Sequence, residues 1–146
     1  MARYLTRVQS PWSADRAFAY LADLRNFAEW DPGVTRSELV AGDGPGPDAA
    51  YAVTVAGVGR PLTLRYETTA YEPPSRIEVR AASSLLTSVD VVTVEPSGGG
   101  SLVTYDATLT LRGPARLGEP ILALGFRRIG DRAAAGLRAA LDGTAA

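Results

Sequence analysis

The feature that most constrains this chain is an alternation of apolar and polar residues that persists from about residue 34 to residue 111. Residues 76–80, Arg-Ile-Glu-Val-Arg, are its clearest example. Successive side chains of a strand point to opposite faces, so this pattern predicts strands with one buried face and one solvated face. Short turn sequences such as Ser-Gly-Gly-Gly at 97–100 separate the runs, which favours antiparallel neighbours within one sheet.

Helical periodicity flanks this region on both sides. Residues 3–9 predict an opening strand, and apolar residues at three- and four-residue spacing predict a helix over 14–24. Asn26 is placed to cap a second, short helix, and a long helix is predicted over 119–141. The order is strand, two helices, about six strands and a long helix, which fits a single α+β domain over 1–146.

A sheet with one buried face needs a cover, and the last helix has the longest apolar stripe. Its members are Leu122, Phe126, Ile129, Ala133, Leu137 and Ala140. We therefore predict a curved antiparallel sheet of about seven strands wrapped around the C-terminal helix. Residues 85–95 contain valines in both alternating sets, so the sequence does not assign their inward face, and a bulge is one explanation.

Composition excludes several kinds of chemistry. The chain has no Cys and no His, which removes disulfides, thiolate nucleophiles and the commonest general base and metal ligand. We expect no metal and no cofactor. A net charge of −1 gives no reason to expect a nucleic-acid partner. No apolar run is long enough to span a bilayer, and the N-terminus does not resemble a signal peptide, so the cytoplasm is the expected location.

Three segments carry a resemblance to a known family. They are the proline-led segment from Ser10-Pro11 to Val34, Tyr-Glu-Pro-Pro-Ser-Arg-Ile at 71–77, and Val-Glu-Pro at 94–96. With this element order, the chain resembles the SRPBCC superfamily, also called START-like or helix-grip proteins, and within it the polyketide cyclase/dehydrase-like group. The resemblance implies a deep pocket between the sheet and the long helix. It implies no catalytic residue, because the superfamily shares no universal catalytic set.

The pocket implied by this resemblance takes its lining from the apolar strand faces, the short helix and the long helix. We expect it to be lined by Trp30, Tyr51, Val53, Leu64, Tyr66, Ile77, Val79, Tyr105, Leu109, Phe126 and Ile129. A buried tyrosine normally needs a partner for its hydroxyl. The three strand tyrosines therefore either present hydroxyls to a ligand or are core residues that bond to protein groups. Trp30 either forms a pocket wall or fastens the short helix to the sheet.

Three functions fit these residues. The leading hypothesis is a carrier or sensor that binds a small hydrophobic molecule, such as a lipid or polyketide-like aromatic. The alternative is a cyclase or dehydrase that uses Tyr, Asp and water, in which Asp90 and Asp106 could divide acid and base roles if both faced the cavity. The third is a protein-interaction module with a closed pocket and an exposed apolar patch. Dimerisation through an edge strand stays open, because no residue pattern tests it.

Overall fold

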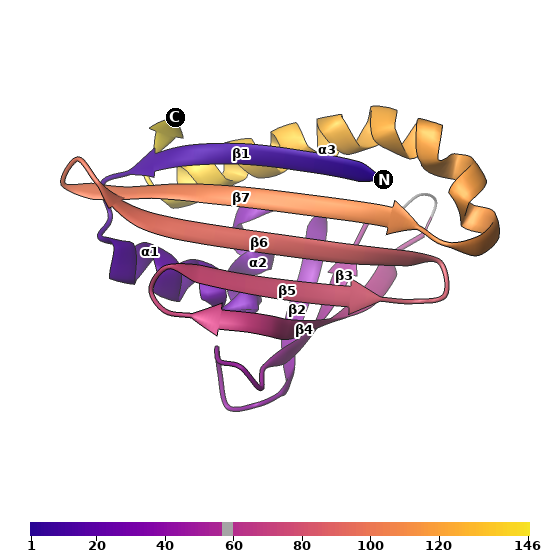
Figure 1. Cartoon of the computed structure of the whole chain (residues 1–146), viewed down its shortest axis with the longest axis horizontal. Helices are drawn as coiled ribbons and strands as arrows, with labels where there is room; N and C mark the ends of the chain where they lie inside the picture. The colour runs from indigo at the N-terminus through magenta and orange to yellow at the C-terminus, as the bar shows by residue number, and fades with distance from the viewer. Residues whose placement is uncertain (57–59) are drawn as a thin grey trace.

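The computed structural model describes residues 1–56 and 60–146, and it has the predicted α+β architecture (Figure 1). An eight-stranded antiparallel sheet, in the order β2-β3-β4-β5-β6-β7-β1-β8, curves around the helices. Its strands are β1 (Ala2–Ser10), β2 (Val34–Ala41), β3 (Ala50–Val55), β4 (Leu62–Glu72), β5 (Arg76–Ala82), β6 (Leu86–Ser97), β7 (Gly100–Leu111) and β8 (Thr144–Ala145). The helices are α1 (Ala14–Ala22), η1 (Leu24–Asn26), α2 (Phe27–Trp30), η2 (Gly113–Gly118) and α3 (Glu119–Ala140).

The sheet agrees with the predicted strands and adds one. β1 pairs with β7 along its whole length, which brings the first strand beside the last long strand. β8, only two residues long, pairs with β1 and was not predicted, because two residues carry no readable alternation. The pairings of β6 with β5 and β7 are regular, so the suggested bulge in 85–95 is wrong.

The structure assigns the inward face of β6, which the sequence left open. Alternate residues from Leu86 to Val94 are buried, and this set includes Ser88 and Asp90. The intervening residues, two threonines and two valines, lie on the other face and are only partly buried. Two polar side chains therefore enter the interior from a strand that the composition alone describes as valine-rich.

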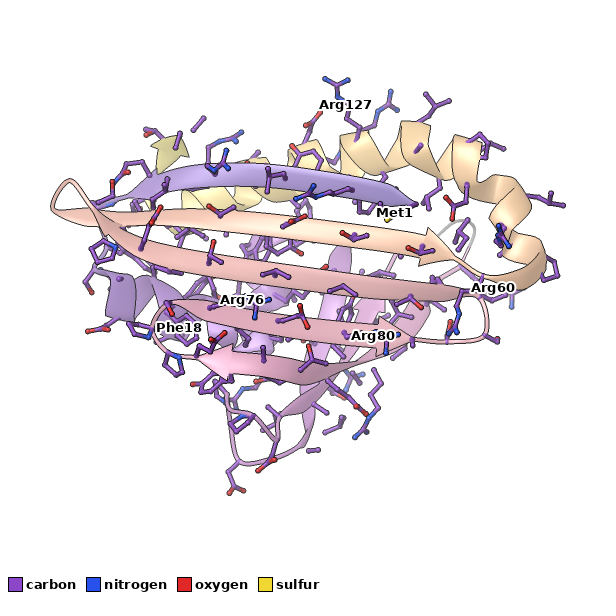
Figure 2. The ribbon with its side chains drawn as sticks, viewed as in Figure 1. Met1, Phe18, Arg60, Arg76, Arg80 and Arg127 are labelled. Carbon is purple, nitrogen blue, oxygen red and sulfur yellow. The ribbon has the colours of Figure 1, made fainter. Side chains whose placement is uncertain are left out.

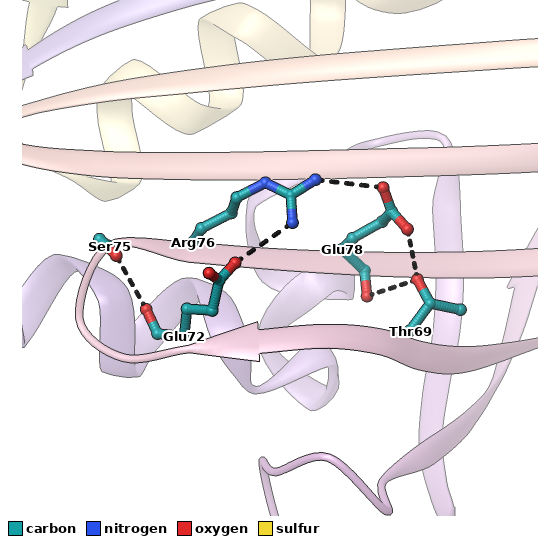
Figure 3. Close-up of polar contacts among 5 residues, drawn as sticks. All are labelled: Thr69, Glu72, Ser75, Arg76 and Glu78. Atoms are coloured by element: carbon teal, nitrogen blue, oxygen red, sulfur yellow. Dashed lines mark hydrogen bonds and ion pairs between the residues drawn. The ribbon is translucent and has the colours of Figure 1, made fainter.

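The convex face of the sheet is polar and faces solvent (Figure 2). At the turn between β4 and β5, the Arg76 guanidinium donates to Glu72 and to Glu78, each at 3.3 Å. The Thr69 hydroxyl donates to the Glu78 carboxylate at 2.7 Å, and the Ser75 hydroxyl donates to the Glu72 carbonyl at 3.0 Å (Figure 3). These contacts are exposed or half-buried, where ion pairs contribute little to stability, and we assign them no functional role.

The long helix α3 packs by its second half. Ala133, Ala134 and Leu137 are buried there, whereas Ile121 and Leu124 in the first half are 77% and 82% exposed. Gly130 allows the close approach, because an added Cβ would lie 2.2 Å from the Tyr4 ring on β1. The first half of α3 extends past the N-terminal start of β1 (Figure 1). Among the described residues, no helix combines the length and hydropathy needed to cross a bilayer.

A buried serine connects the end of β1 to the end of α3. The Ser10 hydroxyl donates to the Leu141 carbonyl at 2.7 Å and accepts from the Trp12 amide at 3.1 Å. We expect Ser10→Ala to lower the free energy of unfolding by about 1–2 kcal/mol, because it leaves a buried carbonyl without its donor. Ser37→Ala is the control, since the Ser37 hydroxyl is buried without a hydrogen-bond partner. Equal urea midpoints for the two variants would contradict this role for Ser10.

Candidate functional site

The interior contains a small cavity between the first helices and the middle of the sheet. Its lining comes from α1, η1, α2 and strands β5, β6 and β7, and consists of Leu21, Leu24, Phe27, Trp30, Ile77, Val79, Asp90, Val92 and Tyr105. The cavity volume is about 20 Å³, enough for roughly one water-sized group. Apart from Asp90, the Tyr105 hydroxyl and the Trp30 indole nitrogen, this lining is apolar, as in most small-molecule sites.

Asp90 is the charged residue of this lining. It is 6% exposed, and its Oδ2 accepts a hydrogen bond from the Tyr105 hydroxyl at 2.7 Å. Within the described residues, its Oδ1 accepts no hydrogen bond from the protein. Burial raises the pKa of the Asp90 carboxyl to about 7, although the Tyr105 hydrogen bond opposes the rise. A carboxyl with this pKa can both accept and donate a proton near neutral pH.

A second polar pair lies near the first. The Tyr66 and Ser88 hydroxyls form a buried hydrogen bond of 2.7 Å between β4 and β6. Burial, and secondarily the charge of Asp90, raise the pKa values of both Tyr66 and Tyr105. Both phenols are therefore neutral hydrogen-bonding groups at physiological pH.

Asp31, which follows α2, adds a second buried carboxyl to this region. It accepts the Gly33 amide at 2.8 Å, and burial raises its pKa. Its charge contributes to the raised pKa of Asp90, as does that of Asp106. No arginine is among the groups that shift the pKa of Asp90. The negative potential around the cavity is therefore not offset by a guanidinium at close range.

Aromatic rings form the helical wall of the cavity. The Phe27 and Trp30 rings stack with centroids 4.9 Å apart, and Trp30 meets Tyr105 edge-on at 5.4 Å. Trp30 lines the cavity and also joins α2 to β7. The three rings and Asp90 surround the same small space.

The predicted pocket residues divide into three groups. Trp30, Ile77, Val79 and Tyr105 line the cavity. Tyr51, Val53, Leu64 and Tyr66 belong to the buried core without lining it. The Tyr51 hydroxyl is buried and makes no hydrogen bond of standard geometry, although the Leu24 amide lies close enough to oppose the rise in pKa that burial causes.

The third group lies toward the C-terminal helix, where the sequence led us to expect the pocket. Leu109 and Phe126 are partly buried, and Ile129 is 51% exposed, so no residue of α3 lines the cavity. The expected place of a ligand pocket, beneath α3, therefore stays a prediction. Gly130 and Gly136 let α3 lie close to β1 and α2, because a Cβ added at either position would overlap the Tyr4 ring or the Trp30 carbonyl.

The sequence also missed residues from the helical side. Leu21, Leu24 and Phe27 line the cavity, and the first two belong to the apolar periodicity that predicted the helix over 14–24. That stripe was a usable signal, because the buried face of an amphipathic helix must lie against the sheet. The sequence named Asp90 as a candidate carboxylate, but the strand alternation could not show that it faces inward, since its neighbours left the face undecided.

The suggested carboxylate pair does not exist. Asp90 on β6 lies opposite Ala107 on β7, and Asp106 lies opposite Val91, the next residue of β6. Successive residues of a strand point to opposite faces of the sheet. Asp106 therefore lies on the convex face, where Arg3 donates two hydrogen bonds to it at 2.9 and 2.8 Å. The sheet separates the two carboxyls, and they cannot share a substrate. Among the described residues, no group of three or more acidic side chains is arranged to hold a metal ion.

A wider hollow lies elsewhere on the surface. It has a volume of about 590 Å³, is broadly open to solvent, and is bordered by the start of α1 and the β6–β7 turn. Its lining is largely Pro, Gly, Ser and Ala. With neither an apolar interior nor converging polar groups, it lacks the features of a ligand pocket.

Comparison with known proteins places this architecture in the START-like, helix-grip class. A START superfamily protein from Mycobacterium smegmatis matches with a TM-score of 0.79 at 13% identity, covering 97% of this chain and 98% of that one. The ZhuI aromatase/cyclase from Streptomyces sp. R1128 matches with a TM-score of 0.78 at 12% identity, covering 96% and 93%. A di-domain aromatase/cyclase of the steffimycin biosynthetic pathway matches over 50% of its length, with a TM-score of 0.70 at 15% identity and 97% of this chain covered.

These identities show a shared fold. The family is shown by the sequence itself, because the model for polyketide cyclase/dehydrase and lipid transport proteins matches residues 1–142. The chain belongs to that family, which confirms the predicted resemblance. No curated protein sequence matches it significantly.

Proposed function

We propose that the protein binds a small hydrophobic molecule in the cavity between the segment 14–30 and the inner face of β5–β7. The observation that carries this proposal is the buried Asp90–Tyr105 pair beside an apolar space. A buried carboxyl whose pKa is raised destabilises the fold at neutral pH. A core that served packing alone would be more stable with an apolar residue there, and such destabilising groups concentrate at functional sites.

A ligand larger than one water-sized group needs the cavity to widen. The sheet side is held by the continuous ladders that join β5, β6 and β7. The helical side is built largely from η1, with three residues, and α2, with four. Short segments with few backbone hydrogen bonds are the easier ones to displace. We therefore expect the Phe27 and Trp30 side to move when a ligand enters.

A second function, cyclase or dehydrase chemistry, is favoured by one specific observation. The Asp90 carboxyl has a pKa of about 7, so near neutral pH it could take a proton from a carbon beside a carbonyl and return it to a departing hydroxyl. For ring closure, the carbanion would attack a second carbonyl of the same molecule, whose oxygen takes up the proton and becomes a hydroxyl. Loss of a further proton from the first carbon, together with that hydroxyl, then releases one water and forms a carbon–carbon double bond. The family description, which includes both polyketide cyclases and lipid transport proteins, accommodates either function.

Mass spectrometry tests the proposed function. We expect the native protein to retain a stoichiometric apolar compound, and the denatured sample to release it for identification. A compound recovered unchanged supports binding, whereas a product lighter by one water than the compound supplied supports the cyclase function. A protein that is empty, and that binds none of a panel of lipids and aromatic compounds, would refute both.

That negative result would favour the interaction-module alternative. That alternative predicts an exposed apolar patch, and the exposed side chains of η2 and of the first half of α3 are the candidate for it. Leu117, Ile121 and Leu124 are 88%, 77% and 82% exposed.

A further inference from the structure

We propose that the cavity selects a ligand whose polar group is a protonated amine attached to an apolar body, and that it rejects ligands whose polar group is a carboxylate. This inference rests on the proposed binding function and names the chemical class of the ligand. It follows from the kinds of groups that surround the cavity and from the size of the space between them.

The first observation is the absence of a positive partner for Asp90. Every arginine among the described residues lies outside the cavity lining. The side chains of Asp31, Tyr66 and Tyr105 are the acidic and phenolic groups buried around Asp90 in the same interior. A carboxylate ligand would add a negative charge to this region without a cation to balance it, which a low-dielectric interior strongly disfavours. An ammonium group would instead form the missing ion pair.

The second observation is the arrangement of hydrogen-bonding atoms. The Tyr105 hydroxyl already donates its proton to Asp90 Oδ2, so its oxygen is left as an acceptor. The second carboxylate oxygen, Asp90 Oδ1, accepts no hydrogen bond from the described residues. The free positions on both groups are therefore acceptors, and an ammonium group supplies three donors.

The third observation is the aromatic wall. The rings of Phe27, Trp30 and Tyr105 all border the cavity, and Trp30 contacts both of the others. Aromatic faces attract cations, and aromatic residues beside an acid are a recurring means of binding ammonium ligands. The same rings would cover an apolar body attached to the amine.

The fourth observation is the size of the cavity. Its volume of about 20 Å³ matches one water-sized group. A primary ammonium head is close to that size, so the existing space fits the head group, and only the apolar body requires the wall to widen. A carboxylate head has three heavy atoms and is therefore larger than one water-sized group.

A matched series of probes with one apolar body tests this inference. The probes are 2-naphthylmethylamine, 2-naphthylmethanol and 2-naphthoate, titrated calorimetrically into the 146-residue protein at pH 8. We expect the amine to bind at least tenfold more tightly than the alcohol, and the carboxylate to bind most weakly. We also expect the affinity for the amine to fall at least tenfold between pH 8 and pH 5, as Asp90 becomes protonated.

Two variants connect the preference to the cavity. Asp90→Asn should abolish the preference for the amine, while Glu95→Gln, the corresponding change at an exposed position of the same strand, should leave it intact. Equal binding of all three probes, or tighter binding of the carboxylate, would overturn the amine inference and leave the binding function standing. Failure of all three probes would also overturn it, and the mass-spectrometric experiment then decides separately whether the protein binds any hydrophobic ligand.

Discussion

Replacing Asp90 with Asn is expected to make the protein more stable at pH 8, by up to about 4 kcal/mol. The pKa of the Asp90 carboxyl rises from its ordinary 3.8 to about 7 on folding. Each pKa unit corresponds to about 1.4 kcal/mol, so keeping this group ionised in the interior costs about 4 kcal/mol above pH 7. Asparagine has nearly the same shape, retains an oxygen that accepts the Tyr105 hydroxyl, and carries no charge.

The sign of the pH dependence follows from proton linkage. Between pH 4 and pH 7 the folded protein keeps a proton on Asp90 that the unfolded chain has released. The contribution of this group to the free energy of unfolding therefore falls as the pH rises through that range and stays constant above it. The difference in stability between Asp90→Asn and the unchanged protein should be small at pH 4 and fully developed at pH 8.

Urea denaturation at several pH values measures this difference. Asp31 also has a raised pKa and contributes a slope of the same sign, so the variant should retain some pH dependence. Asp106→Asn serves as the control, because this exposed pair with Arg3 contributes little. If Asp90→Asn had the same stability as the unchanged protein at pH 8, then Asp90 would not be an unfavourably buried charge and the main support for the proposed site would be lost.

The second large effect is expected at the crossing of α3 and α2. A Cβ added at Gly136 would lie 1.8 Å from the Trp30 carbonyl oxygen, which is backbone and cannot rotate away. Gly136→Ala must therefore push the two helices apart, and we expect it to lower the free energy of unfolding by about 3 kcal/mol. The displaced α2 also carries Phe27 and Trp30, so ligand binding should weaken as well.

Gly125→Ala is the matched control for this substitution. Gly125 lies in the same helix, and nothing stands within 4 Å of a Cβ added there. Alanine favours helix over glycine by about 1 kcal/mol, so Gly125→Ala should leave stability unchanged or raise it by up to that amount. Thermal or urea unfolding of the two variants provides the comparison. Equal destabilisation by both would mean that helix propensity or flexibility, and not the contact with Trp30, explains the result.

The buried Asp90 carboxyl and the close contact between α3 and α2 belong to the same part of the structure. α3 contacts α2 through Gly136, and α2 supplies the aromatic wall that faces Asp90. The sheet and the second half of α3 thus hold a short helical wall against a buried polar pair. If the protein binds a ligand here as we propose, this short wall is the segment that we expect to move.

The sequence by itself determined the architecture and the chemistry that is excluded. Alternation identified the long strands, because a half-buried strand must place apolar residues at every second position. Periodicity located α1 and α3 nearly to their observed ends, Ala14–Ala22 and Glu119–Ala140. The absence of His and Cys removed whole classes of mechanism before any fold was known.

Only the tertiary structure decided which polar side chains reach the interior and where the cavity lies. Asp90 has valines on both sides, and only its pairing between β5 and β7 turns it inward and leaves Asp106 outside. The cavity lies beside α1 and α2, and its lining combines side chains from six elements that are far apart in the sequence. A local sequence pattern reports the average environment of a residue. The face on which a side chain lies, the contacts between helices and the position of a cavity depend on residues that are distant in the sequence.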